Sequence, residues 1–181
     1  MTKISEEQLS EQRVIAARIK ARNVGGADDP ARLSLAFVDT YGCQQNEADS
    51  EIIRGQLSYM GYAFTNSEPL ADLIIINTCA VREHAEQRVL GNVGHLVHTK
   101  RPGQIIALCG CAVQQKTVRD LVLKSYRHVD VMFGPHELWR LPEILEKALN
   151  SPQKTKIVEV RDSDGERVDG LPTLRKEGEQ A

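Results

Sequence analysis

Short apolar runs alternate with amphipathic stretches along the central part of the chain. Runs typical of strands occur at Leu33–Val38, Tyr62–Thr65, Leu73–Ile76, Ile105–Leu108 and Val129–Phe133. Between them, apolar residues recur at helical spacing, which predicts helices around 48–60, 85–97, 118–122 and 142–149. The run at 73–76 is apolar on both faces, which is typical of the buried centre of a parallel sheet.

Strands that alternate with helices in units of roughly 30 residues predict right-handed βαβ crossovers. We therefore expect an α/β fold over residues 32–150: a doubly wound, mainly parallel five-stranded sheet with helices on both faces. Residues 1–31 predict a solvated helical extension followed by a Gly- and Asp-containing linker. Residues 151–181 have one possible strand, Lys156–Val160, and too little apolar content to bury themselves, so we expect a linker there.

Composition narrows the possible functions. The 181 residues are 41% hydrophobic and 27% charged, a globular balance for one domain with tails, and no apolar run is long enough to predict a membrane span. Lys and Arg number 23 against 25 Asp and Glu, so no overall positive field favours nucleic-acid binding, and any RNA contact has to be local. The N-terminus is polar and acidic, so we expect a cytoplasmic protein whose cysteines are not in disulfides.

Each cysteine follows a predicted strand; the four are Cys43, Cys79, Cys109 and Cys111. In a parallel sheet all strand exits open on one edge, where doubly wound folds bind ligands. Three of the four, all except Cys109, lie among Gly, Asn, Thr or Gln, and thiolates gathered in this way suit an iron-sulfur cluster or a soft metal. A zinc site completed by His84 or His136, and unrelated thiols, remain alternatives, and we expect Cys109 to pack inside the sheet.

Three segments around these cysteines resemble a known family. Thr40–Glu51, Asn77–Arg82 and Gly110–Gln114 are similar to the three cysteine boxes in the N-terminal domain of radical-SAM methylthiotransferases. The resemblance covers roughly residues 32–175. Details such as Gly134-Pro135-His136 and Gly170-Leu171-Pro172 are most similar to the branch that makes 2-methylthio-N(6)-dimethylallyladenosine in tRNA, with the ribosomal-protein and threonylcarbamoyladenosine branches next.

The resemblance implies a cofactor and a role. Three thiolates, those of Cys43, Cys79 and Cys111, would hold an auxiliary [4Fe-4S] cluster and leave one iron without a protein ligand. That iron would carry or receive the sulfur that is added to C2 of the adenosine next to the anticodon. The implied partner is tRNA, and the sulfur donor is not specified. The boxes also contain Asn46, Asn77, Thr78 and Arg82, which either contact the ligands or the substrate, or cap turns and helix starts.

One departure from the family pattern limits what this chain does alone. The family's radical-SAM domain carries a C-x3-C-x2-C motif for a second [4Fe-4S] cluster that cleaves S-adenosylmethionine, and the four cysteines here have no such spacing. We therefore expect an N-terminal domain of a longer enzyme, inactive alone and without catalytic residues of its own. Alternatives are a flavodoxin-like binding module, although the chain has no Gly-rich phosphate loop, and a structural zinc domain.

Overall fold

A six-stranded parallel sheet forms the centre of the computed structural model, which describes residues 4–24, 33–79, 83–151, 155–161 and 170–175. The strands are β1 Leu35–Tyr41, β2 Ala63–Phe64, β3 Leu73–Thr78, β4 Ile105–Cys109, β5 Val131–Phe133 and β6 Ile157–Glu159. Their order is β2-β1-β3-β4-β5-β6, and every neighbouring pair is parallel. The predicted α/β fold is confirmed, with six strands where five were predicted.

The sixth strand comes from the segment that we expected to stay unburied. Residues 157–159 pair with β5, and Ile157 packs against the core. The Ile157 N–H donates to Asp130 O at 2.9 Å, and the Gly134 N–H donates to Glu159 O at 3.0 Å. A three-residue strand has too little periodicity to predict its place in a sheet, whereas the open edge of β5 supplies the backbone partners that fix it there.

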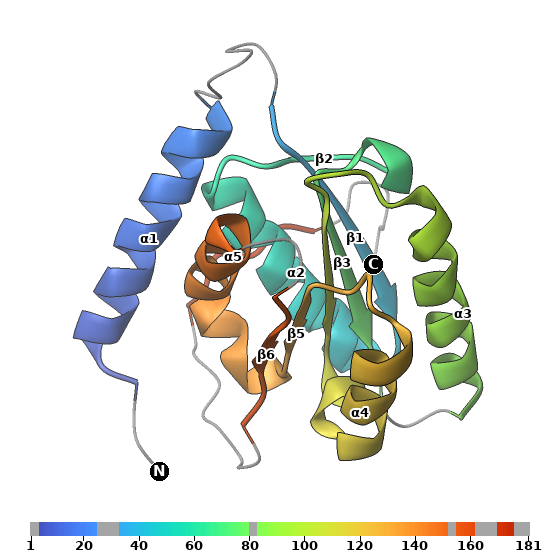
Figure 1. Ribbon diagram of the computed structural model, residues 1–181. Helices are drawn as coiled ribbons and strands as arrows, with labels where there is room; N and C mark the ends of the chain where they lie inside the picture. Colours follow the sequence, from blue (N-terminus) through green and yellow to red (C-terminus); the bar gives the residue numbers. More distant parts are fainter. Residues whose placement is uncertain (1–3, 25–32, 80–82, 152–154, 162–169, 176–181) are drawn as a thin grey trace.

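Helices cover both faces of the sheet (Figure 1). The α-helices are α1 Glu6–Val24, α2 Gln44–Tyr59, α3 Glu83–Thr99, α4 Lys116–Ser125 and α5 Leu141–Asn150, with 3-10 turns η1 Glu68–Leu70, η2 Cys111–Gln114 and η3 Pro135–Arg140. Helices α1, α2 and α5 lie on one face, and α3 and α4 on the other. None of the described helices is both long and apolar enough to cross a membrane.

Strand β3 lies inside the sheet and contributes side chains to the hydrophobic cores on both faces. All six of its residues are buried. Leu73 and Ile75 pack with α1, α2 and α5, whereas Ile74 and Ile76 pack on the α3 and α4 side. Because neighbouring strand residues point to opposite faces, an apolar run on both faces is what a strand covered from both sides needs.

The N-terminal helix belongs to the core, which corrects the prediction of a solvated extension. Ile15, Ala16 and Ile19 of α1 are at most 5% exposed and pack in the core cluster with α2 and α5. The Asn23 side chain also donates to Met60 O at 2.9 Å. The partial apolar stripe of α1 predicts a helix but not its partner. The predicted linker after it falls at residues 25–31, outside the described residues.

Residues 170–175, here called the strap, cross α2 at Gly55. A Cβ at that glycine would lie 2.1 Å from Pro172 O, a distance at which Cβ atoms are essentially never found. One turn earlier, Glu51 O accepts a 2.9 Å hydrogen bond from the Leu174 N–H. This part of the C-terminal segment thus packs on the domain. Its predicted role as a linker towards a further domain stays a prediction.

Replacement of Gly55 by alanine is expected to dislodge the strap. The added methyl group gains helix propensity but collides with the strap backbone, so the Leu174 amide should exchange faster with solvent. Gly91→Ala is the matched control: it also lies in a helix but has nothing within 4 Å of the new Cβ, so it should stabilise the protein by about 0.5–1 kcal/mol. Urea unfolding and hydrogen exchange measure both effects. Unchanged protection of the Leu174 amide in Gly55→Ala would contradict the described packing.

Candidate functional site

The three predicted ligands lie at the carboxyl ends of three adjacent strands. Cys43 precedes α2, two residues after β1; Cys79 directly follows β3; and Cys111 begins η2 after β4. Strand β1 extends three residues beyond the predicted end at Val38, because Asp39–Tyr41 continue the ladder with β3. The chain leaves β1 into α2 on one face of the sheet, whereas it leaves β3 into α3 on the opposite face. The strand order therefore reverses between β1 and β3. The candidate site is therefore at the switch point.

The loops that carry these cysteines are packed closely against one another. The Cys79 N–H donates to Tyr41 O at 2.9 Å. A Cβ at Gly42 would lie 2.7 Å from Cys79 Cβ, and a Cβ at Gly110 would lie 2.3 Å from Asn77 Oδ1. Gly110 also has φ +94°, a conformation that L side chains rarely adopt. Glycine before Cys43 and before Cys111 is thus what lets the three loops meet.

Two buried asparagines tie the start of α2 to β3. Asn46 Oδ1 accepts from the Cys43 N–H at 3.3 Å, and Asn46 Nδ2 donates to Asn77 Oδ1 at 3.1 Å. Asn77 Nδ2 in turn donates to Asn46 O at 2.8 Å and to Ser50 Oγ at 2.9 Å. Both asparagines therefore make structural contacts, and the Asn46 side chain lies against Cys43. A contact of either residue with a ligand or substrate stays a prediction.

The other two candidate residues in the cysteine boxes are Thr78 and Arg82. The Thr78 side chain is 1% exposed, and its hydroxyl has no hydrogen-bond partner in the described structure. Such an orphaned group at the base of the Cys79 loop is a donor available to something bound there. Arg82 lies outside the described residues. Ser50, which completes the link to Asn77, was missed by the sequence analysis; a polar Asn ending an apolar strand is the signal that a buried partner exists.

The thiols of Cys43 and Cys109 have opposite environments. Cys43 is exposed at the start of α2, where hydrogen bonds from the Asn46 and Gln45 backbone, and from the Cys79 thiol beside it, lower its pKa. Cys109 is buried in the core, and burial raises the pKa of its thiol well above the ordinary value. The prediction that Cys109 packs inside the sheet is confirmed, and the surroundings of Cys43 favour its thiolate.

The described residues contain no group of three or more His, Cys, Asp or Glu side chains arranged to hold a metal ion. The donor chemistry nevertheless suits an iron-sulfur cluster, because thiolates are its ligands and backbone N–H groups at a helix start favour their charge. The three-thiolate site stays a prediction, as does the zinc alternative. For the latter, the His84 side chain lies outside the described residues, and His136 Nδ1 is buried without a partner in the described structure.

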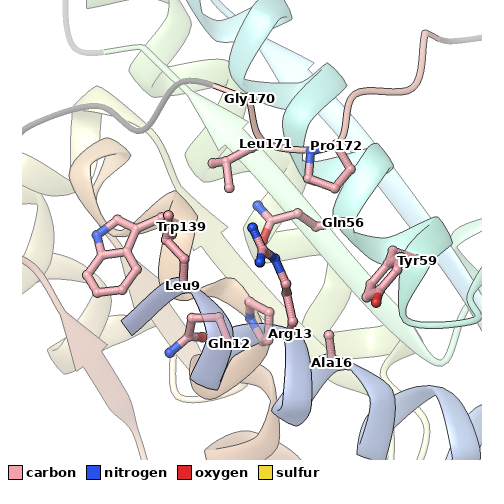
Figure 2. Close-up of a pocket in the computed structure, with 11 residues that line it drawn as sticks. Leu9, Gln12, Arg13, Ala16, Gln56, Tyr59, Trp139, Gly170, Leu171 and Pro172 are labelled. Atoms are coloured by element: carbon pink, nitrogen blue, oxygen red, sulfur yellow. The ribbon is translucent and has the colours of Figure 1, made fainter. Parts of the chain in front are cut away.

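A separate cavity of about 230 Å³ lies between α1, α2 and the strap (Figure 2). Figure 2 shows Leu171 and Pro172 on one side of it and Leu9 and Arg13 on the other. The Gln56 amide that lines it already donates to Leu138 O at 2.8 Å. None of the described residues that line this cavity is a cysteine, so it is separate from the cysteine loops.

The contrast between the thiols predicts the order in which they react. With iodoacetamide, Cys43 should be alkylated first and at a lower pH than an unfolded cysteine, because a lowered pKa gives more thiolate at a given pH. Cys109 should react last, at a rate set by unfolding. Mass spectrometry of timed samples across a pH series measures both rates. Alkylation of Cys109 as fast as Cys43 in the folded protein would contradict this assignment.

A family model and individual known proteins both match this chain. Residues 35–134, which include all four cysteines, match the model of the family described as "Uncharacterized protein family UPF0004". The chain is 39% identical over 180 residues to a tRNA-2-methylthio-N(6)-dimethylallyladenosine synthase of Acetivibrio thermocellus, covering 98% of this chain and 37% of the relative. Enzymes of the same name from Clostridioides difficile and Staphylococcus aureus are 42% identical over 172 residues and 45% identical over 142 residues.

These matches cover most of this chain but only part of each relative. The coverage is 94% of this chain and 36% of the Clostridioides difficile protein, and 77% and 27% for the Staphylococcus aureus protein. The chain thus spans about a third of the length of the curated relatives that it matches. The resemblance that the three cysteine boxes predicted is confirmed, and the chain belongs to the UPF0004 family.

Proposed function

We propose that this chain is the auxiliary [4Fe-4S]-binding domain of a tRNA methylthiotransferase, which adds a methylthio group to C2 of N(6)-dimethylallyladenosine next to the anticodon. The observation that carries the proposal is the close packing of the loops that bear Cys43, Cys79 and Cys111 at the switch point of the sheet. The names of the relatives support the proposed substrate and reaction.

In this proposal the chain's own residues build the ligand set. Cys43 contributes a thiolate favoured by the first turn of α2, and Cys79 and Cys111 contribute the other two. The cluster, when bound, supplies one iron without a protein ligand, at which sulfur is held or delivered. Asn46 and Asn77 fix the start of α2 against β3, so that the backbone N–H groups keep pointing towards the Cys43 sulfur.

In this proposal the remaining components belong to a longer protein. A second [4Fe-4S] cluster and S-adenosylmethionine require the radical-SAM motif, which this sequence does not contain, so we expect the chain alone to be inactive. Residues 151–181 would lead towards that region from the cluster-binding domain at 32–150. We place the enzyme in the cytoplasm, where it meets its tRNA and a sulfur donor of a class still to be identified.

Anaerobic reconstitution of the chain with iron and sulfide tests the cluster directly. We expect about four irons per chain and a visible thiolate-to-iron charge-transfer band. Cys43→Ala, Cys79→Ala and Cys111→Ala should each lose most of the iron, because three thiolates hold the cluster. Cys109→Ala is the matched control and should keep it, since that thiol lies in the core.

The same measurement separates the alternatives. One zinc per chain, no colour and unfolding on chelation would favour a structural zinc domain. A colourless chain that takes up neither metal but binds a nucleotide would favour a flavodoxin-like module. Full iron uptake by the triple variant Cys43→Ala, Cys79→Ala, Cys111→Ala would overturn the proposal, as would loss of iron in the Cys109 control alone.

A further inference from the structure

A second cavity, here called the Arg54 pocket, lies at the β2 edge of the sheet. Its volume is about 370 Å³, and it is lined by Val38 of β1, Arg54 of α2, residues 64–66 after β2, and Leu174 and Arg175 of the strap. Arg54 lies three helical turns beyond Cys43, about 16 Å along the axis of α2. The pocket is thus separate from the cysteine loops.

The feature that sets this pocket apart is a buried guanidinium with few partners. Arg54 is only 6% exposed, yet within the described part of the chain its side chain makes a single hydrogen bond, from Nη2 to Val38 O at 3.4 Å, the long end of the normal range. A guanidinium has five N–H donors, so most of those of Arg54 make no hydrogen bond to the described residues. Among the described residues no carboxylate forms an ion pair with Arg54; Glu51, one turn earlier, instead faces Arg175 at 3.6 Å.

A buried charge without a counter-ion is costly, which makes this pocket favourable for an anion. The other polar groups that line it can also donate. Thr65 Oγ1 accepts from the Ser67 N–H at 3.1 Å, which leaves its own hydrogen for a ligand, and Asn66 presents an exposed amide. Arg175 lies at the rim, with 77% of its side chain exposed. The described lining holds two guanidinium groups and no carboxylate.

We propose that the Arg54 pocket binds a phosphate group. Several donors arranged around one cavity match the several oxygens of a phosphate, and arginine pairs with two of these oxygens at once. The phosphate comes either from an RNA backbone or from a free phosphate compound, and both use the same donors. The site does not depend on the cluster, so it stands or fails separately from the proposed function.

Titration of the chain with inorganic phosphate, followed by nuclear magnetic resonance, tests the site. We expect the Arg54 Nε–H and the Asn66 side-chain amide signals to shift with phosphate, and not with chloride at equal ionic strength. Arg54→Gln removes the buried charge and should weaken binding about ten-fold or more. Asn66→Asp, an isosteric change at an exposed position, adds a negative charge to the lining and should weaken it similarly. This second variant gives an answer even where Arg54→Gln does not fold.

Arg13→Gln is the matched control, because Arg13 is an exposed arginine on α1 outside the Arg54 pocket. It should leave the phosphate affinity unchanged. The proposal is overturned by the absence of phosphate-dependent shifts at Arg54 and Asn66, or by equal weakening in the Arg13 and Arg54 variants, which would indicate nonspecific surface attraction. An oligouridine RNA that displaces phosphate from these residues identifies a backbone phosphate, whereas shifts by phosphate without competition from RNA identify a free phosphate compound.

Discussion

The side-chain amide of Asn77 is the contact on which the arrangement of the cysteine loops depends. It lies at the end of β3, fully buried, and donates to Asn46 O and Ser50 Oγ of α2 while accepting from Asn46 Nδ2. Its Oδ1 atom also occupies the space that a side chain at Gly110 would need. One residue therefore contacts the helix start that follows Cys43 and the turn that precedes Cys111, and Cys79 is two residues further along the chain. A buried amide with all its bonds made is costly to rearrange, which keeps these loops in place.

The same fold gives chemically different thiols from identical side chains. Cys43 lies two residues after β1, and Cys109 is the last residue of β4, so both lie at the carboxyl edge of the sheet. The Cys43 thiol lies at the start of α2 near backbone N–H groups, whereas the Cys109 thiol is buried in the core. The first environment stabilises a thiolate, and the second stabilises the neutral thiol. Whether a cysteine at this edge favours a thiolate therefore depends on its place in an exposed loop or in the core.

The C-terminal strap gives α2 a role beyond carrying Cys43. The helix begins at the cysteine loops, carries Arg54 into a polar pocket, and receives the strap across Gly55. The strap in turn supplies Leu174 and Arg175, so that it forms part of the wall of the Arg54 pocket. The segment that leaves the sheet is thus part of the surface that the domain presents to its surroundings.

The sequence by itself determined the strands and helices of the centre and the edge where the chemistry lies. Apolar runs such as Leu73–Ile76, and helical spacing between them, predict local structure, and parallel connections bring Cys43, Cys79 and Cys111 to one edge. Only the tertiary structure decided that α1 packs in the core, that β6 joins the sheet, and that Arg54 is buried with few partners. The physical reason is that local periodicity reflects what each segment buries, whereas these three outcomes depend on surfaces supplied by residues far away in the chain.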